Sequence, residues 1–550
     1  MQLAKMGIFL CDCGGSLKNI DFSKISGDLE KLEGVAFVDV SHSLCLEEGE
    51  RTISSRILSE DIDRVVIAAC STELHERKFV TLVEKLGLNP NLLSWANIRE
   101  QCSWSLEDDV TEKAKELIRM AIGKARLLRP VERRGVPVSR QVLIVGGGFS
   151  GMKLAIELSK LGLGTTIVER ESILGGKLNE AEGFYGLEIG PRRMLSLMMT
   201  AIEEDKNVEV LTSAEVRGVR GEVGGFEVTM KRAGEEHSRG FGAIVFATGY
   251  RTEISPQNSE IRPGVNVISH LDLVEMLRAP ERLERRPSII GFILDVCDEN
   301  SRLPTISALN NALAVRDKLG SEVYVFCRNL KVDSEGVEEL YGEARERGVV
   351  FVKFDEAPQM HCDDGQVVIE ARDVLLGEEV VLRCDFLVAD ERALPSEGTK
   401  ALGSMLNVGS DSQGFYQDGN VHLYPVASAR KGVFFVGGCR GNMDLARASN
   451  DIASAVMSIY ALLGPGETVI EVEKVKVDRD KCRACLTCIR ACPHGAIQLL
   501  RLSADKEAAQ ISDLACDGCG ICAAVCPAKA ISFEGYSDEQ MLAELETIGK

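Results

Sequence analysis

The sequence predicts a multidomain α/β protein that ends in a small α+β domain. Residues 141–169 read as strand, glycine-rich turn, helix and strand, and a second strand–helix–strand pattern follows at 287–326. The last domain is predicted by the motif C-x2-C-x2-C-x3-C-P, which occurs at 482–493 and again at 516–527. A chain of 550 residues has room for roughly three or four domains.

The charge and composition of the chain limit which partners it can have and in which cellular compartment it is expected. The formal net charge of −20 argues against a nucleic-acid or anionic-membrane partner. No run reaches the roughly eighteen apolar residues of a spanning helix, and the N-terminal apolar stretch is too short for a signal peptide. The 18 cysteines of such a chain are typical of metal ligands in a reducing compartment. We therefore expect a cytoplasmic protein with no direct membrane insertion.

Residues 1–130 are predicted to form a small α/β domain. Apolar runs indicate strands at Gly7–Leu10, Val35–Val40, Val65–Ala69 and Leu92–Ile98. Amphipathic patterns indicate helices at Glu73–Leu86 and Asp109–Leu127. Five cysteines lie in this domain: Cys11, Cys13, Cys45, Cys70 and Cys102. Thiols that follow parallel strands converge at one edge of the sheet, which indicates a metal cluster, but buried structural cysteines remain the alternative. The proline-containing stretch 128–139 is predicted to be a linker.

The next unit predicts a dinucleotide-binding turn. The strand Gln141–Val145 leads into a G-x-G-x-x-G turn and then a helical pattern, and a second strand ends at an acidic residue. Glycines in this arrangement allow a tight turn, a close approach to pyrophosphate, and close packing of helix on sheet. We expect the dinucleotide to contact Gly146, Gly148, Phe149, Ser150, Gly151, Glu169 and Arg170.

Further elements favour FAD over NAD. The paired glycines before Lys177 are similar to the segment that approaches the flavin in two-dinucleotide-domain flavoproteins, and Ala247-Thr248-Gly249 resembles the element that closes their FAD domain. A late glycine–aspartate element, from Gly438 to Asp444, has the position of a flavin and ribityl contact. We therefore add Gly176, Lys177, Ala247, Thr248, Gly249, Gly438 and Asp444 to the expected FAD site, with Lys177 as the candidate catalytic residue that tunes the flavin.

The FAD domain is predicted to be discontinuous, with a thioredoxin-reductase-like Rossmann fold. Its two parts span 136–265 and 420–465, and a pyridine-nucleotide-type domain at 266–419 separates them. The turn after the first strand of that inserted domain, Asp295–Asn300, is acidic and has no glycine fingerprint. An acidic turn repels pyrophosphate, so we expect this domain to have lost NAD(P) binding.

Residues 471–550 are predicted to form a bacterial-type ferredoxin domain with two [4Fe–4S] clusters. In this motif three cysteines of a run bind one cluster and the fourth binds the other. That rule gives one set of Cys482, Cys485, Cys488 and Cys526, and a second of Cys516, Cys519, Cys522 and Cys492. A zinc ribbon also uses C-x2-C pairs, but it lacks two interlocked sets ending in Cys-Pro. A terminal helix follows, with Ser537 and Gln540 at capping-box positions.

Nearly the whole chain resembles the HdrA family, the iron–sulfur flavoproteins of heterodisulfide reductase. The marks are Cys11–Gly14, Ala68–Ser71 with His75 and Glu76, Asn97–Trp104, the flavin elements, Gly441–Asp444, the double cysteine run and Gly535–Gln540. The resemblance implies a cytoplasmic FAD protein with several [4Fe–4S] clusters. It also implies a third, N-terminal cluster, with Cys13, Cys45, Cys70 and Cys102 as ligands and Cys11 in reserve.

Two departures from the family matter. Many members carry another ferredoxin module in the flavoprotein region, whereas residues 103–296 of this chain contain no cysteine. Members also often have a cysteine-rich stretch where this chain has Asn300–Leu313, so Cys297 or the fifth N-terminal cysteine would have to substitute. Fewer relays weaken the case for full electron bifurcation.

Together, these observations predict an electron-transfer subunit of a multi-subunit redox complex. It would relay or bifurcate electrons between FAD, the clusters, ferredoxin and a partner reductase of the heterodisulfide reductase type. The resemblance implies HdrB- and HdrC-like subunits and a hydrogenase- or dehydrogenase-linked donor as partners, with this chain as a homodimer within the complex. The alternatives are a subunit of a quinone-interacting or aromatic-CoA-reducing complex, a self-contained NAD(P)H oxidoreductase, and a non-catalytic scaffold.

Overall fold

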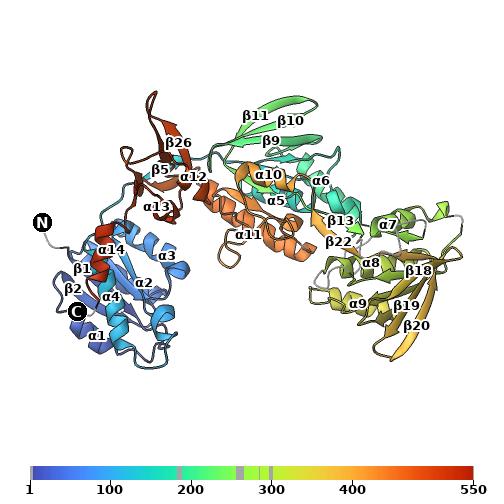
Figure 1. The fold of residues 1–550 in the computed structure, drawn as a ribbon, viewed down its shortest axis with the longest axis horizontal. Coiled ribbons are helices and arrows are strands. Elements are labelled where there is room, and N and C mark those ends of the chain that lie inside the picture. Colours follow the sequence, from blue (N-terminus) through green and yellow to red (C-terminus); the bar gives the residue numbers. More distant parts are fainter. Residues whose placement is uncertain are drawn as a thin grey trace. The chain divides into compact units, whose positions relative to one another are not determined.

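The computed structural model describes residues 4–181, 189–254, 266–283, 285–296, 302–441 and 443–548 (Figure 1). The chain forms two compact units. The first comprises Met1–Gly135, Val469–Cys492 and Ala496–Lys550, and the second comprises Val136–Thr468 with Pro493–Gly495. The two ends of the chain thus belong to one unit, and the flavoprotein region forms the other.

A four-stranded parallel sheet organises the N-terminal part of the first unit. Its order is β2-β1-β3-β4, with β1 at Met6–Cys11, β2 at Val35–Ser41, β3 at Arg64–Ala69 and β4 at Leu93–Asn97. The helices are α1 at Phe22–Leu29, α2 at Glu47–Ser59, α3 at Thr72–Lys85 and α4 at Thr111–Ala125. Separate apolar cores lie on its two faces, one with α1 and α4 and the other with α2 and α3. Four predicted strands and two predicted helices are therefore confirmed, with small shifts at their ends.

The C-terminal part of the first unit is the α+β domain that contains both cysteine runs. Two antiparallel pairs form it, β25 (Val475–Val477) with β28 (Ile531–Phe533) and β26 (Ile497–Arg501) with β27 (Glu507–Ile511). Two short helices, α12 (Thr487–Ala491) and α13 (Ile521–Ala524), each follow the first cysteines of a run. Short strands also form at β5 (Arg133–Pro137), inside the predicted linker, and at β24 (Glu467–Glu471).

The terminal helix α14, Asp538–Leu545, packs on α4 of the N-terminal part (Figure 1). The predicted capping box at Ser537 and Gln540 is confirmed. The Gln540 side chain is buried, and its amide donates to the Leu127 carbonyl at 3.2 Å. The helix therefore ties the two parts of the first unit together.

A five-stranded parallel sheet organises the first half of the second unit. Its order is β23-β12-β6-β7-β8, from Val433–Phe435, Ala243–Phe246, Gln141–Val145, Gly164–Val168 and Val208–Leu211. The helices are α5 at Phe149–Lys160, α6 at Pro191–Glu203, α10 at Thr399–Leu406 and α11 at Leu445–Leu463, with short 3-10 turns at Gly176–Asn179 and Gly437–Arg440. An antiparallel sheet adds β9 (Ala214–Arg220), β10 (Phe226–Arg232) and β11 (Glu235–Phe241). This parallel sheet combines strands from both 136–265 and 420–465.

The other half of the second unit has its own parallel sheet. Its order is β14-β21-β15-β16-β17, from Val267–Ile268, Phe386–Val388, Ile289–Ile293, Glu322–Cys327 and Val349–Lys353. Its helices are α7 at His270–Arg278, α8 at Leu303–Lys318 and α9 at Val337–Glu346. An antiparallel sheet of β18 (Gln359–Asp363), β19 (Gln366–Asp373) and β20 (Glu378–Cys384) packs on it, and β13 (Tyr250–Ile254) pairs with β22 (Glu391–Pro395).

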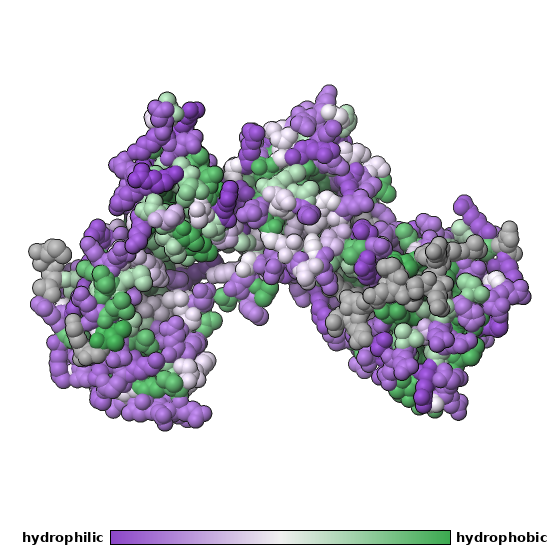
Figure 2. Space-filling model, in the orientation of Figure 1, coloured by the Kyte–Doolittle hydropathy of each residue, from purple (hydrophilic) through white to green (hydrophobic). Residues whose placement is uncertain are grey.

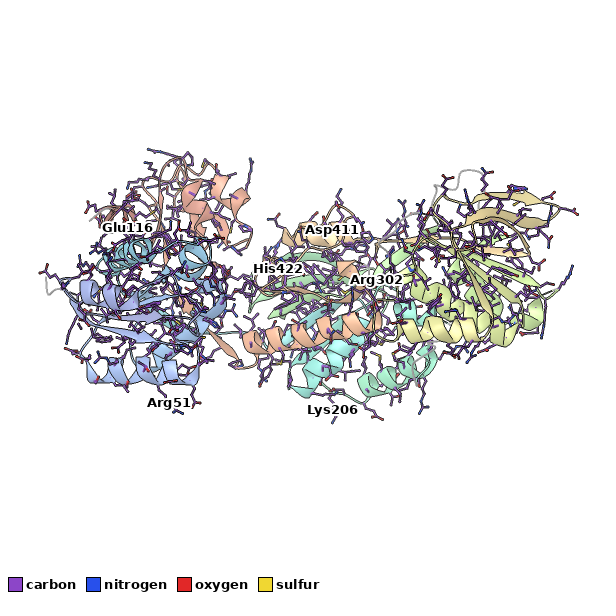
Figure 3. All side chains as sticks on the ribbon, turned by 90° about the horizontal axis from the view of Figure 1, so that it is seen from below. Arg51, Glu116, Lys206, Arg302, Asp411 and His422 are labelled. Atoms are coloured by element: carbon purple, nitrogen blue, oxygen red, sulfur yellow. The ribbon has the colours of Figure 1, made fainter. Side chains whose placement is uncertain are left out.

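Hydrophilic side chains cover much of the face shown in Figure 2, as the charged composition predicts. Charged side chains such as Arg51 on α2 and Lys206 after α6 point outward (Figure 3). Within the described ranges, none of the helices combines the length and the apolar character that crossing a membrane requires.

Candidate redox sites

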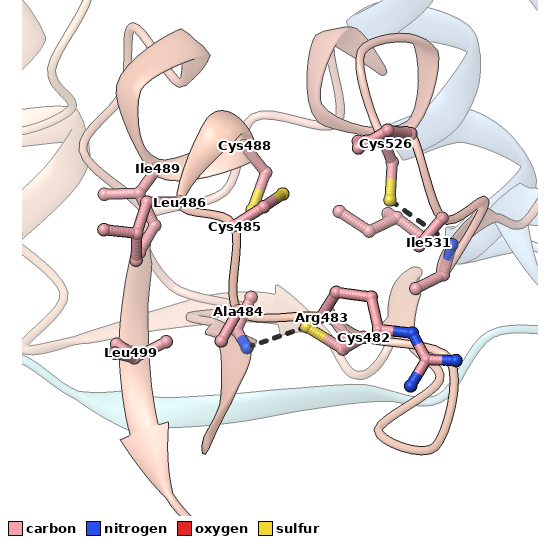
Figure 4. A pocket seen from close by; sticks show the side chains of 15 residues that line it. Cys482, Arg483, Ala484, Cys485, Leu486, Cys488, Ile489, Leu499, Cys526 and Ile531 are labelled. Carbon is pink, nitrogen blue, oxygen red and sulfur yellow. Dashed lines mark hydrogen bonds between the residues drawn. The ribbon is translucent and has the colours of Figure 1, made fainter. Parts of the chain in front are cut away.

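The first set of cluster thiols lines a single cavity in the C-terminal α+β domain (Figure 4). Its four cysteines are Cys482, Cys485, Cys488 and Cys526. Three come from the first run and the fourth from the second, as the crossover rule predicts for this set. Backbone N–H groups of Ala509 and Ala530 donate to two of the sulfurs, at 3.5 and 3.3 Å. Such donors stabilise negative charge on cluster sulfur.

The thiols of the second set also lie together in this domain. This set comprises Cys516, Cys519, Cys522 and Cys492. Burial raises the pKa of the Cys522 thiol to about 11, and the neighbouring Cys516, Cys492 and Cys519 add to that shift. The pKa of Cys516 is raised by burial and then by Cys492 and Cys519. Cysteines that influence one another in this way are close in space. The eight thiols therefore fit two four-cysteine sites, each completed by the other run.

The glycine turn after β6 has the geometry of a dinucleotide site. Gly146 has φ +114°, which disfavours any side chain, and a Cβ on Gly151 would lie 2.0 Å from the Gly146 carbonyl oxygen. Gly148 is the N-cap of α5 and supplies no side-chain cap. The N–H groups at the start of α5 are therefore available to a pyrophosphate, which the helix dipole also favours.

The carboxylate of Glu169 lies beside this turn. Its two oxygens accept hydrogen bonds from the N–H of Gly147 at 2.7 Å and of Glu171 at 2.8 Å. Arg170 points elsewhere, forming an ion pair with Glu171 at 3.2 Å. Phe149 packs against the core of the five-stranded parallel sheet. Of these predicted contacts, Glu169 thus has the position best suited to a ribose.

The paired-glycine segment approaches the same turn. Gly175 forms an isolated bridge with Gly148, and the Cα of Gly148 would lie 3.3 Å from a Cβ on Gly176. Lys177 is ion-paired with Glu180, and its Nζ lies 5.3 Å from the centre of the Tyr250 ring. The side chain of Lys177 therefore carries a neutralised positive charge next to the predicted flavin elements.

The Ala247-Thr248-Gly249 element contains an orphaned polar atom. The Oγ1 of Thr248 is buried and has no hydrogen-bond partner among the described residues. A buried hydroxyl without a partner is costly, so this atom fits a polar group of a bound cofactor. Gly438 lies close to Tyr250, and Asp444 caps α11 by accepting a hydrogen bond from the Arg447 N–H at 2.8 Å. The Asp444 carboxylate therefore has a structural partner already.

Sequence reasoning missed a buried charged triad beside Gly438. Arg440 forms ion pairs with Asp418 and Asp451, and all three side chains are largely buried. Burial raises the pKa of Asp451, and its Oδ2 accepts from the Gly437 N–H at 3.3 Å. The arginine inside a glycine-rich turn was the available signal, because a buried arginine requires carboxylate partners. The triad fixes the turn that the flavin is expected to contact.

The N-terminal cysteines divide between the two faces of their sheet. Cys11 and Cys70 belong to the core with α2 and α3, and Cys13 and Cys45 pack against it. Cys102 belongs to the opposite core, where its thiol donates to the Val110 carbonyl at 3.8 Å. Four of the five cysteines thus lie in or against the core with α2 and α3, and Cys13 also packs against the opposite core that contains Cys102. Cys297, the other proposed substitute, lies outside the described residues.

Charge interactions link the grouped thiols. The sulfurs of Cys11 and Cys13 lie 3.8 Å apart, and a hydrogen bond from Cys13 lowers the pKa of Cys11 to about 6. Burial raises the pKa of Cys70, and the positive charge of Arg99 opposes that shift. The positive charge of Arg99 also opposes the rise in the pKa of Cys13. The sequence alone assigns no role to Arg99. A cation beside grouped thiols favours an anionic cluster there.

Two buried carboxylates follow the strands at the switch point of the second parallel sheet. Asp295 comes after β15 and Asp390 after the neighbouring β21, where α/β proteins bind nucleotides. Asp295 accepts hydrogen bonds from the N–H groups of Arg328 and Asn329, and Asp390 accepts one from the Val296 N–H. Burial raises the pKa of Asp295, and the charge of Asp390 adds to the shift. A pyrophosphate at this switch point would meet acidic groups.

Two family descriptions match parts of the chain. "Pyridine nucleotide-disulphide oxidoreductase" matches residues 109–268, and "4Fe-4S dicluster domain" matches residues 475–533. The first match covers the glycine turn and Glu169, and the second covers both cysteine runs. The residues described above fit the cofactors that these families bind, FAD and two [4Fe–4S] clusters. The zinc-ribbon alternative is excluded by the second match.

Curated relatives match almost the full chain. The A subunit of the ferredoxin:CoB-CoM heterodisulfide reductase of Methanosarcina mazei is 28% identical, over 98% of this chain and 80% of that protein. The A subunit of the H(2):CoB-CoM heterodisulfide,ferredoxin reductase of Methanothermobacter thermautotrophicus is 27% identical, over 91% of each. The iron–sulfur A subunit of the CoB–CoM heterodisulfide reductase of Methanocaldococcus jannaschii is 27% identical, over 99% of this chain and 98% of that protein.

Solved thioredoxin reductases also align with the chain. That of T. acidophilum is 17% identical with a TM-score of 0.39, covering 59% of this chain and 99% of its own. That of Lactococcus lactis is 20% identical with a TM-score of 0.41, covering 58% and 98%.

Proposed function

We propose that this chain, an HdrA-like iron–sulfur flavoprotein, conducts electrons between a ferredoxin and a partner subunit that reduces a disulfide. It is a flavin-dependent oxidoreductase and the electron-transfer subunit of a redox complex. When bound, FAD exchanges electrons in pairs and each cluster exchanges one at a time, so the chain couples the two kinds of chemistry.

The observation that carries the proposal is the interlocked arrangement of the eight C-terminal thiols. Each four-cysteine set takes one ligand from the other run, which holds the two sets close together in one small domain. Two clusters held this way form a relay. In the same chain, the turn at Gly146–Gly151 and the orphaned Thr248 hydroxyl supply a site for the flavin.

The acidic residues of the second parallel sheet argue that the electron donor is not NAD(P)H. Asp295 and Asp390 are buried at its switch point, where a pyridine nucleotide would place its phosphates. Bringing a pyrophosphate to two buried carboxylates costs free energy through like-charge repulsion. The domain at 266–419 is therefore proposed to be a scaffold between the two halves of the FAD domain, without NAD(P) binding.

A third cluster is proposed at the edge of the N-terminal sheet. Its ligands are Cys11, Cys13, Cys45 and Cys70, with Cys11 in the place that the family resemblance gave to Cys102. The shared core and the nearby charge of Arg99 support this choice. Because α14 ties this part to the ferredoxin domain, the cluster belongs to the same unit as the other two.

The names of the relatives indicate which partner subunits this chain would have. Those names describe the A subunits of multi-subunit heterodisulfide reductases that use ferredoxin. We propose HdrB- and HdrC-like subunits as the acceptors, with a further donor linked to a hydrogenase or a dehydrogenase. We also propose a cytoplasmic location, supported by the number of cysteines assigned to clusters, because a reducing compartment keeps such thiols from forming disulfides.

Electron donors offered to the anaerobically purified chain test the main proposal. Reduced ferredoxin is expected to bleach the flavin absorbance, and NADH at the same electron equivalents is not. A Cys482→Ser/Cys485→Ser variant that keeps its FAD is the control, because it should lose bleaching by ferredoxin. Bleaching by NADH alone would establish the NAD(P)H oxidoreductase alternative, and an iron-loaded chain without flavin would leave a scaffold.

A further inference from the structure

The two cysteine runs differ in charge. From Asp478 to Arg490 the chain has four basic and two acidic side chains, whereas from Glu507 to Ala528 it has three acidic and no basic ones. This contrast occurs in a chain whose net charge is −20. The first cluster site is therefore surrounded by local positive charge on an otherwise acidic protein.

The acidic side chains of the first run already have partners. Asp478 forms an ion pair with Lys481 at 3.3 Å, and Asp480 with Lys506 at 2.7 Å. Four exposed cations near the first cluster site form no ion pair with any carboxylate of the described residues: Arg479, Arg483, Arg490 and Lys529. We call these four the basic rim. Its charge is not neutralised within the described chain.

Two members of the basic rim lie at the first cluster site, and the other two, Arg479 and Arg490, are close to its cysteines in sequence. Arg483 lines the same cavity as the four cysteines (Figure 4), and Lys529 stands between the lining residues Ala528 and Ala530. Cys485 is exposed, and so is the neighbouring Leu486, with 36% of its surface accessible. A cluster ligand and an apolar side chain thus meet solvent within a group of unpaired cations.

We propose that the basic rim is the docking surface for a small acidic protein that carries its own iron–sulfur cluster. This inference rests on the proposed function and assigns the site where that electron carrier binds. Opposite charge raises the rate of encounter, and a small apolar centre lets the complex dissociate quickly after transfer. Nucleic acid or an anionic membrane would also attract the cations, but neither uses the exposed cluster ligand at their centre.

The transfer at this surface changes only the electron count. One electron leaves the reduced cluster of the carrier and enters the site held by Cys482, Cys485, Cys488 and Cys526. No bond forms or breaks, and no proton moves. The acidic remainder of the chain repels an acidic carrier, so productive encounters are directed to the basic rim.

Charge reversal at the basic rim tests the inference. The Arg483→Glu/Arg490→Glu variant of the full chain is compared with Arg193→Glu/Lys206→Glu, which makes the same charge change at exposed positions on and after α6. Reduced 2[4Fe–4S] ferredoxin of net negative charge is the probe. Its dissociation constant and the second-order rate of cluster reduction are measured across ionic strength, with iron and FAD content determined for each protein.

The rim variant is expected to react about tenfold or more slowly at low salt and to bind ferredoxin correspondingly weakly. The difference should vanish near 1 M salt, where the screening length is about 3 Å. The control pair should stay within about twofold of the wild type, and Arg483→Gln/Arg490→Gln should show a smaller fall. Photoreduced deazaflavin, a small donor, should reduce all proteins equally.

Other outcomes separate the two proposals. If the wild type reacts with ferredoxin and the rim variant, with full iron, reacts equally fast at every salt concentration, the docking surface is wrong and the proposed function stands. If cluster reduction slows equally in the rim variant and in the control variant, the net charge of the protein steers ferredoxin and the specific docking surface is wrong. If the iron- and FAD-loaded wild type neither binds nor exchanges electrons with ferredoxin, the proposed function fails with it.

Discussion

Glu169 shows how one side chain joins the sequence pattern to the expected FAD site. It directly follows β7, and its carboxylate accepts a hydrogen bond from the Gly147 N–H, so it holds the glycine turn at the position where a ribose is expected. Hydrogen bonds to a charged acceptor contribute about 1.5–3 kcal/mol each. The sequence predicted this residue from its place after a strand, because that place is fixed by the βαβ pattern alone.

Replacing Glu169 with Gln is expected to weaken FAD binding about tenfold or more. The amide keeps the shape but loses the charge, and its NH2 group cannot accept the N–H groups that the carboxylate accepts. The measurement is FAD titration of the apoprotein, with FAD per polypeptide after gel filtration. Glu171→Gln, two residues on and exposed, is the control and should bind FAD normally. Unchanged affinity in Glu169→Gln would remove this residue from the site.

At the scale of elements, the packing of α14 on α4 decides how the first unit is held together. Gly123 lies where the two helices meet, and a Cβ there would be 2.6 Å from the Ala543 carbonyl oxygen. Gln540 adds buried hydrogen bonds to Leu127, Glu534 and the turn before α14. The sequence predicted the helix and its cap but not its partner, because the cap is local and the contact joins residues more than 400 apart.

Gly123→Ala is expected to loosen α14. Alanine raises helix propensity by about 1 kcal/mol, but the clash with backbone of the partner helix costs about 1–3 kcal/mol. Hydrogen exchange of residues 538–545 should become about tenfold faster. Gly27→Ala in α1, where a Cβ meets no atom within 4 Å, is the matched control and should leave that exchange unchanged. Protection of α14 as in the wild type would mean that the helices yield without cost.

At the scale of the whole molecule, metal content reports how many cluster sites the chain holds. With four iron atoms per four-cysteine site, three sites give about twelve irons with one FAD, and two give about eight. We expect about twelve in the anaerobically purified chain. Cys11→Ser should lower the iron content to about eight, whereas Cys102→Ser should leave it near twelve. The reverse result would restore Cys102 as a ligand, and about eight in the wild type would leave no N-terminal cluster.

Much of the fold could be predicted because its signals are local. The spacing of the cysteine runs, the glycine turn between strand and helix, and the acidic turn after β15 each lie within a few residues. Thr248, Tyr250 and Arg440 show the limit. Their burial, and the partners that they have or lack, depend on elements from β12 to α11 that the chain brings together only when folded.

The sequence by itself determined the cofactors, because ligand spacing and turn geometry are set by a few neighbouring backbone angles. Only the tertiary structure decided which N-terminal thiols share a face. Cys11 is the last residue of β1 and its side chain lies in the core with α2 and α3, whereas Cys102 comes after β4 and its side chain lies in the core with α1 and α4. Only packing likewise attached α14 to α4. The face that a side chain takes and the helix that covers it depend on contacts between distant segments, which no local pattern encodes.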